Sequence, residues 1–407
     1  MLQRLAGRGA GDVTVFRPAC PVAYHYRSED LAGPPAFTCT TLYVAGGMYG
    51  NPYALDAIQA RASTEPSPPE IVFNGDFHYL DAGAAVFRAV DDRVRACHAT
   101  QGNIEYALTV ADDTLGCGCD YPGYVPDTVV ADSDAIVARL RTAAAAPENY
   151  PWLAALPRYL TVAVGGHRAG VVHGDPENLA GWRLALEAVE PQRPHIRDRT
   201  GFTGTPTTAG QVLDWFRRAD VEVLCCTHTG LPYAQDFQHP AGRYLVANNG
   251  CAGLPGFAGR RHGVLTRLSV LPDVPGDSLY GLTTPGLRFD ALPVEYDHSR
   301  WITHFLDTWP PGSPGRRSYQ HRIEHGTWLT PGDAARGTVT GSAGGRALPT
   351  RCGRPRETPR RRLPAARGGG VPGAGCHLVC LDRASGQAGH RTRILPGVSG
   401  DWRRAAR

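Results

Sequence analysis

The stretches TLYVAGGMYGN (residues 41–51) and IVFNGDFHYLD (residues 71–81) decide the predicted fold. Each begins with a short apolar run, typical of a buried strand, and continues into a turn that contains glycine and polar residues. Between them, Asn51 to Ala62 has apolar residues at helical spacing, and Asn51 is placed to cap that helix. We therefore expect two strands, joined by a helix, whose polar turns lie at one edge of a sheet.

Similar apolar runs recur along the chain and end in polar tips. We expect further strands at Tyr159–Val164, Ala169–Val172, Val221–Cys225, Tyr244–Ala247 and Val264–Ser269. The expected further helices are Ala84–Arg95, Ser133–Ala146, Glu177–Ala188, Thr208–Arg218 and Tyr296–Trp309. The pair Gly165-Gly166 indicates a hairpin between the strands on either side of it. Residues 98–106 are expected to be a short extended piece with a turn at Gly102-Asn103.

The composition indicates a soluble protein with a sizeable core. The chain has 407 residues, of which 42% are hydrophobic. No apolar run approaches the roughly 18 residues of a membrane span, and the first residues lack the apolar segment of a signal peptide. We therefore expect a cytoplasmic location and no membrane partner. All 42 basic residues are Arg, a bias that is typical of a GC-rich, bacterial genome.

The charge is unevenly distributed. The net charge is +4, but residues 337–407 hold 14 Arg and 3 acidic residues, which gives this C-terminal tail about +11 and the remainder about −7. The tail is rich in Gly, Pro and Arg, so we expect it to be disordered. Nucleic-acid binding through the tail is an alternative, and we favour a solvated extension. The 11 Cys are expected to be thiols, because the zinc spacings are absent.

Four polar residues follow separate predicted β segments: Asp76, Asn103, His173 and His228. Open α/β sheets place ligands at the carboxyl ends of their strands. One carboxylate, one amide oxygen and two imidazoles form a suitable shell for a divalent ion such as Mn, Fe or Zn. The set therefore predicts a metal site.

Residues 42–268 resemble the calcineurin-like metallophosphoesterases. The corresponding motifs are, in order, GGMYGN (46–51), NGD (74–76), GNIE (102–105), VVHGD (171–175) and THTGLP (227–232). The resemblance implies an α/β fold, a four-layer αββα sandwich with metals between the sheets. Together with the composition, it leads us to expect four segments: an N-terminal extension packed on the domain (1–40), the metallophosphoesterase-like domain (41–272), a loop-rich extension (273–336) and the tail (337–407).

The resemblance implies one complete metal site and one depleted site. In that family one metal is held at the positions that here are Gly47, Tyr49, Asp76 and Gly230, so three of its four ligands are missing. The other metal is held at the positions of Asp76, Asn103, His173 and His228, and this set is complete. We therefore expect one divalent transition metal (Mn, Fe or Zn) per chain. Ile104 stands where the family has the His that assists the leaving group.

Other residues near these motifs are candidates for catalysis. His78 can point to the same side of an extended segment as Asp76, and Tyr49, in the place of a ligand His, is suited to hydrogen-bond phosphate. Glu105 and Asp175 are candidates for orienting the imidazoles. The resemblance implies a hydrolase that acts on a small phosphate mono- or diester with metal-activated water as nucleophile. The alternative is a weakly active or inactive member that binds a metal, a phosphate ligand or a protein. The sequence leaves substrate and oligomeric state open.

Overall fold

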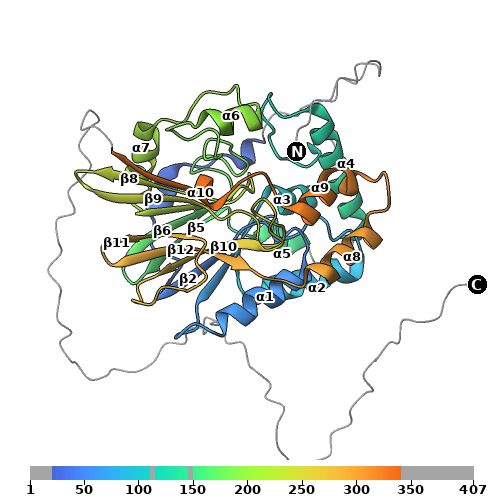
Figure 1. Ribbon diagram of the computed structural model, residues 1–407, viewed down its shortest axis with the longest axis horizontal. Coiled ribbons are helices and arrows are strands. Elements are labelled where there is room, and N and C mark those ends of the chain that lie inside the picture. Colours follow the sequence, from blue (N-terminus) through green and yellow to red (C-terminus); the bar gives the residue numbers. More distant parts are fainter. Residues whose placement is uncertain (1–20, 111–114, 145–149, 341–407) are drawn as a thin grey trace, which may run out of the picture. The chain divides into compact units, whose positions relative to one another are not determined.

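The computed structural model describes residues 21–110, 115–144 and 150–340. Within them the chain forms two β-sheets that pack face to face (Figure 1). The first sheet has seven strands in the order β1 (Phe37–Cys39), β5 (Tyr159–Val164), β6 (His167–Val172), β7 (Val223–Cys226), β9 (Gly242–Asn248), β8 (Tyr233–His239) and β13 (Ala335–Thr340). The second has six strands in the order β11 (Tyr280–Thr284), β12 (Leu287–Val294), β10 (Gly263–Ser269), β2 (Thr41–Ala45), β3 (Glu70–Asn74) and β4 (His98–Thr100).

The parallel strands decide where the polar turns lie. β2, β3 and β4 run parallel in the second sheet, and β6, β7 and β9 run parallel in the first. Parallel neighbours end at the same edge of a sheet, so the turns after β3, β4, β6 and β7 share one region. Successive side chains of β2 point to opposite faces of the sheet, and both faces are buried. Tyr43 and Ala45 pack in the core under the helices, whereas Leu42 and Val44 pack in the core between the two sheets.

Helices cover both outer faces, which gives the four-layer arrangement. Figure 1 shows α1 (Pro52–Ala62), α2 (Ala84–Arg95) and α8 (His298–Thr308) on one side of the sheets, and α6 (Pro194–Thr200) and α7 (Ala209–Ala219) on the other. The remaining helices are η1 (Val22–Tyr24), η2 (Ser28–Ala32), α3 (Asn103–Thr109), α4 (Asp127–Ala143), α5 (Tyr150–Ala155), α9 (Pro314–His325) and α10 (Pro331–Ala334). The fold is therefore α/β, with two mixed sheets between helical layers.

Local signals predicted several elements correctly. Asn51 caps α1 by accepting hydrogen bonds from the backbone N–H groups of Tyr53 and Ala54. The Gly165-Gly166 hairpin is confirmed, because β5 and β6 are antiparallel and join there. The strands expected at 41–45 and 71–73 and the helix at 84–95 are also present.

Other predictions of secondary structure were wrong. The helix expected at Glu177–Ala188 is absent: the Asp175 carboxylate accepts a hydrogen bond from the Glu177 N–H and forms a local turn that replaces the helix. The piece after Gly102 is helix α3 and not extended chain. Helix α4 begins at Asp127, so Ser133 lies inside it, where its hydroxyl hydrogen-bonds Tyr121. The segment expected to be loop-rich after residue 273 contains β11, β12 and three helices.

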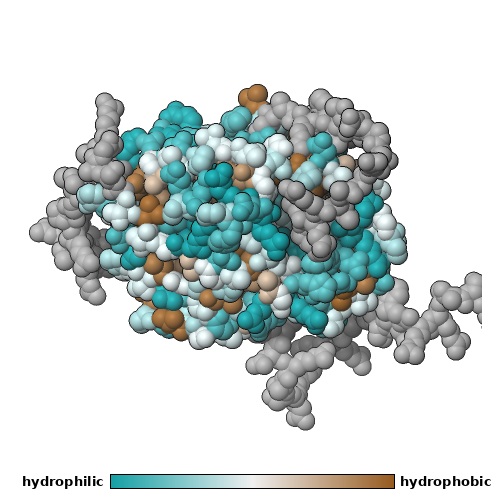
Figure 2. All heavy atoms as spheres, turned by 45° about the horizontal axis from the view of Figure 1, so that its top comes forward, coloured by the Kyte–Doolittle hydropathy of each residue, from teal (hydrophilic) through white to brown (hydrophobic). Residues whose placement is uncertain are grey.

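The described surface is mixed in character. On the face shown in Figure 2, hydrophobic residues are scattered among hydrophilic ones. The large hydrophobic side chains that are exposed in the described part of the chain are Val22 and Val274. Within the described ranges, none of the helices has both the length and the apolarity needed to cross a membrane. Most of the tail, from residue 341 on, lies outside the described residues.

Candidate metal centre

Four side chains from the ends of four strands converge at one point between the sheets. Asp76 follows β3 and Asn103 follows β4, whereas His173 follows β6 and His228 follows β7. Potential ligand atoms of Asp76, His173 and His228 all lie within 4.8 Å of one another. The Nε2 atom of His173 lies 3.3 Å from Asp76 Oδ2 and 3.2 Å from Asn103 Oδ1. Each sheet thus contributes two residues, and all four are buried.

A tight turn places Asp76. Gly75 and Asp76 both have left-handed backbone conformations, with φ of 70° and 53°. A Cβ atom at Gly75 would lie 2.5 Å from His173 Nδ1, so a larger residue would collide with this imidazole. The Asp76 Oδ1 atom accepts a hydrogen bond from the Ile104 N–H at 3.2 Å. The turn and this bond together fix the carboxylate in the cluster.

Each imidazole is anchored by a hydrogen bond from one ring nitrogen, and its other ring nitrogen is available to a metal ion. His173 Nδ1 donates to the Asn74 carbonyl at 2.8 Å, which directs Nε2 toward Asp76. His228 Nε2 donates to the Cys119 carbonyl at 3.0 Å, and its buried Nδ1 has no hydrogen-bond partner in the described structure. Histidines that bind metal ordinarily donate their other N–H to a carbonyl or carboxylate in this way.

The loop before α4 orients Asn103. The Asn103 Nδ2 group donates to the Cys117 carbonyl at 3.0 Å and to Cys119 Sγ at 3.2 Å. These two bonds turn Oδ1, the oxygen that a metal ion requires, toward His173. Since the Cys119 carbonyl also holds His228, this loop supports two of the four residues. No motif in the sequence indicated that role.

The environment keeps one imidazole ready to bind a cation. Burial, and then the proximity of His173, lower the pKa of His228 to about 4, so its Nδ1 lone pair is free at neutral pH. Burial also disfavours the charged form of His173, but the Asp76 carboxylate outweighs this effect and raises the pKa of His173. This set of donors fits a divalent transition metal ion. It consists of a carboxylate, an amide oxygen and two anchored imidazoles, one of which has a buried nitrogen without a partner in the described structure.

Asn74 ties the two sheets together beside the cluster. It is the last residue of β3, and its Nδ2 group donates to the Val172 carbonyl at 2.8 Å and to Thr227 Oγ1 at 2.9 Å. Its Oδ1 accepts a bond from Thr100 Oγ1 at 2.9 Å. Because Val172 ends β6 and Thr227 follows β7, this single buried amide fixes the distance between the strand ends that carry the four residues.

The structure does not bring His78 into the cluster. Its Nδ1 lies 2.7 Å from Asp81 Oδ2 and its Nε2 lies 3.5 Å from Asp91 Oδ1. The ring stacks on Phe87 with 3.7 Å between ring centroids. Both nitrogens are therefore occupied, and the geometry favours a structural role over the catalytic role expected for this residue.

Glu105 and Asp175 do not contact the imidazoles through hydrogen bonds either. The Glu105 carboxylate accepts bonds from the backbone N–H groups of Asp76, Phe77, His78 and Gly102. Burial, with the nearby Asp76 charge, raises the pKa of Glu105 to about 7. Glu105 therefore shapes the turn that carries Asp76, and Asp175 shapes the turn that begins at Gly174.

A cavity of about 120 Å³ opens beside the cluster and is bordered by Asp76 and His228. Tyr49 lines this cavity, as the sequence led us to expect, and so does Ile104. The remaining lining residues were not anticipated: Tyr79, Cys119, Tyr121, Trp182, Thr229, Tyr319 and Arg322. Tyr319 and Arg322 belong to α9, beyond the motifs and without a sequence pattern to mark them.

The fold and the cluster agree with the resemblance that the sequence motifs indicate. Two facing sheets between helical layers, with polar residues from both sheets meeting at their strand ends, match the arrangement that the sequence motifs imply for a calcineurin-like metallophosphoesterase. No protein-family profile and no curated protein sequence matches this chain.

Several solved structures are similar to the chain at low sequence identity. A metallophosphoesterase from Sphaerobacter thermophilus matches at 16% identity with a TM-score of 0.43, over 71% of this chain and 99% of that one. A hypothetical protein from Pyrococcus horikoshii matches at 18% identity and a TM-score of 0.46, over the same shares of the two chains. A 5'-nucleotidase precursor from Thermus thermophilus matches at 14% identity and a TM-score of 0.29, over 66% of this chain and 58% of that one.

Proposed function

We propose that the protein is a metal-dependent hydrolase of phosphate mono- or diesters. One observation carries the proposal: the ligand atoms of Asp76, His173 and His228 lie within 4.8 Å of one another, beside the Asn103 amide oxygen. The chemistry of the set suits one ion of Mn, Fe or Zn per chain. When bound, such an ion supplies Lewis-acid activation of water and of a phosphoryl oxygen.

The residues of the chain divide the remaining tasks. The Asp76 carboxylate, held by the Ile104 N–H, offsets positive charge in the cluster. Tyr49 lines the cavity, and burial raises the pKa of its hydroxyl well above the usual value, so the hydroxyl keeps its proton and can donate a hydrogen bond. We propose that it donates to a phosphoryl oxygen of the substrate.

The absence of a protonating residue beside the leaving group limits which phosphate esters the protein can hydrolyse. Ile104 lines the cavity at the position where the resembled family has a protonating His, and its side chain has no proton to give. Esters with good leaving groups, such as aryl phosphates, depend least on such protonation. We therefore propose that hydrolysis slows steeply as the leaving group becomes more basic.

The test combines metal content with turnover. Purified protein loaded with Mn²⁺ should contain about one ion per chain by elemental analysis, and should hydrolyse p-nitrophenyl phosphate or bis-p-nitrophenyl phosphate. His228→Ala should lose both properties, because it removes the unpartnered Nδ1. His321→Ala, on the exposed surface of α9, is the matched control. A wild-type protein that holds no transition metal and hydrolyses neither ester would overturn the proposal.

A second candidate function is binding without turnover. It is supported by the same Ile104 position and by Gly47 and Gly230, which offer no side chain at two expected ligand positions. Under this alternative the cavity holds a metal and a phosphate ligand, or presents them to a partner. Tight phosphate binding with one metal per chain, and no turnover of either aryl ester, would favour this alternative.

A further inference from the structure

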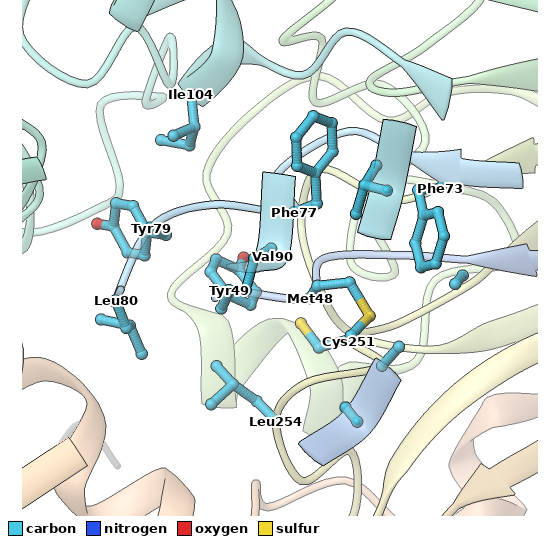
Figure 3. Close-up of a cluster of buried hydrophobic side chains, with 14 of the residues drawn as sticks. Met48, Tyr49, Phe73, Phe77, Tyr79, Leu80, Val90, Ile104, Cys251 and Leu254 are labelled. Atoms are coloured by element: carbon cyan, nitrogen blue, oxygen red, sulfur yellow. The ribbon is translucent and has the colours of Figure 1, made fainter. Parts of the chain in front are cut away.

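Neighbouring side chains crowd Gly47 and Gly230, the two glycines that stand where the resembled family has ligands of its other metal. A Cβ atom on Gly47 would lie 2.6 Å from the Tyr49 ring. A Cβ atom on Gly230, which has a φ of 65°, would lie 2.8 Å from Cys251 Sγ and 3.6 Å from the Tyr49 hydroxyl. Figure 3 shows Tyr49 and Cys251 in the same cluster of buried hydrophobic side chains. The two glycines thus leave space that the Tyr49 and Cys251 side chains occupy.

A guanidinium lies at the same place. Arg322 Nη1 is 3.7 Å from the Cβ position of Gly230, and its Nη2 donates to the Gly230 carbonyl at 3.0 Å. Its Nε donates to the Pro255 carbonyl at 3.1 Å. These two bonds hold the side chain of Arg322 against the loops that follow β7 and β9. They fix the position of the guanidinium.

Arg322 has no anionic partner within the described residues, although its side chain is partly buried. A guanidinium has five N–H donors, and two of them are used by the carbonyls of Pro255 and Gly230. Arg322 is also the one arginine among the described residues that line the cavity. A partly buried guanidinium without an anionic partner, held at the wall of a cavity, is therefore placed to bind an anionic ligand.

The charge of Arg322 is retained. Burial works against the charged form, but the neighbouring Cys251, Tyr49 and Tyr319 outweigh it and raise the pKa of Arg322 above its usual value. Arginine is suited to phosphate because its planar fork can bind two oxygens at once. A phosphoryl group that reached Asp76 and His228 would enter the cavity that Arg322 borders.

We propose that Arg322 binds a phosphoryl oxygen of the ligand and supplies the positive charge that a second metal ion provides in two-metal phosphoesterases. The four-residue cluster would hold one divalent ion, and the Arg322 guanidinium and the Tyr49 hydroxyl would both donate to phosphoryl oxygens. This inference rests on the proposed function, because it assigns Arg322 to the same cavity, but it concerns anion binding and can fail separately.

The experiment measures phosphate binding and metal content in parallel. Inorganic phosphate is titrated by calorimetry into the Mn²⁺-loaded protein, and metal per chain is measured by elemental analysis. Arg322→Gln should leave the metal content unchanged and weaken phosphate binding about 10- to 100-fold, since hydrogen bonds to charged groups are strong. Arg316→Gln is the matched control, because Arg316 lies on the same helix and donates to Gln320.

Each outcome decides the proposal. Unchanged phosphate affinity in Arg322→Gln, or two metal ions per wild-type chain, overturns the role of Arg322 and leaves a metal-dependent hydrolase intact. If the wild type holds no metal, the proposed function fails, and the effect of Arg322→Gln on phosphate binding by the metal-free protein still decides the role of Arg322. If Arg322→Gln does not fold, Arg322→Met, which keeps the length of the side chain and removes its charge, replaces it: weaker phosphate binding supports the proposal, and unchanged binding overturns it.

Discussion

His78 stands two residues after Asp76, yet its ring belongs to a separate buried network. Asp81 and Asp91 flank its two nitrogens, and Arg95 pairs with the other oxygen of Asp91. Burial disfavours the imidazolium, but the Asp81 charge outweighs it and raises the pKa of His78 to about 9. The ring is therefore charged at neutral pH and holds the turn between β3 and α2.

His78→Leu should destabilise the fold while sparing the metal site. The change leaves Asp81 buried without its cation, and breaking a buried pair in this way costs about 3–5 kcal/mol. Urea unfolding measures the loss of stability, and elemental analysis of the folded fraction measures metal per chain. His321→Leu on the exposed face of α9 serves as the control. Unchanged stability with lost metal would instead show that His78 is a ligand.

At the scale of elements, local chemistry decides what the sequence can predict. Asn51 and Gly165-Gly166 carry their own backbone signals, so α1 and the hairpin of β5 and β6 follow from short stretches. Strands β11 and β12 were missed, although the local turn signal Pro285-Gly286 lies between them; β12 pairs with β10, and β11 pairs with β12. The helix predicted from the apolar spacing of Glu177–Ala188 does not form, because the Asp175 side chain stabilises a turn at its start.

The same distinction applies to the candidate site. The four residues of the cluster each follow the end of a strand. Strand order and the motifs therefore predicted that their side chains lie close together: Asp76, Asn103, His173 and His228. Arg322 and Tyr319 reach the cavity only because α9 docks there, a contact made by long-range bonds such as Arg322 to Pro255. The Cys119 carbonyl that anchors His228 is a backbone group, which no side-chain motif could indicate.

A buried charge cluster holds the second sheet together at its middle strand. Arg267 on β10 is fully buried and bonds both oxygens of Glu65, with Nε to Oε1 at 2.7 Å and Nη2 to Oε2 at 2.9 Å. It also donates to Asp273 at 2.9 Å and lies 3.6 Å from Asp290 on β12. One side chain thus links the segment after α1 to two neighbouring strands.

Arg267→Met should cost about 3–5 kcal/mol of unfolding free energy, because it leaves the Glu65 carboxylate without its cation in a largely buried setting, whereas Asp290 keeps its pair with Arg288. Urea denaturation at pH 7 gives the difference from the wild type. Arg217→Met is the contrasting variant, since Arg217 and Asp214 form a surface pair, and such pairs contribute about 0–1 kcal/mol. Equal losses in the two variants would contradict a special role for the buried cluster.

The pH dependence of the Arg267→Met effect follows from the Glu65 carboxyl. Burial would raise the pKa of Glu65, but its bonds from Arg267 and Tyr43 outweigh burial and lower it. A carboxyl with a lowered folded-state pKa stabilises the fold above its unfolded pKa of about 4.3, and that stabilisation is lost as pH falls through the lower value. In Arg267→Met, burial without the Arg267 bonds leaves Glu65 with a higher folded-state pKa than in the wild type. The stability difference between wild type and Arg267→Met should therefore be largest at neutral pH and shrink as the pH falls through the higher pKa of the variant and then through the lower pKa of the wild type.

At the scale of the molecule, the candidate metal cluster and Asn74 join the two sheets through buried polar groups. Asp76 and Asn103 come from one sheet, and His173 and His228 come from the other. An ion bound by all four residues holds both sheets at once, and unfolding must release it. Binding of metal to the native state alone adds stability by mass action, about 2.7 kcal/mol at a free metal concentration of 100 times Kd.

Mn²⁺ should therefore raise the melting temperature of the wild type in proportion to the logarithm of its concentration above Kd. His228→Ala should lose this shift, because it removes a ligand of one sheet, and Asn103→Ala should lose it as well, because it removes a ligand of the other. His321→Ala, outside the cluster, should keep the full shift. If either cluster variant keeps it while the metal-free stabilities remain equal, the ion is held by one sheet alone and the four-residue site is wrong.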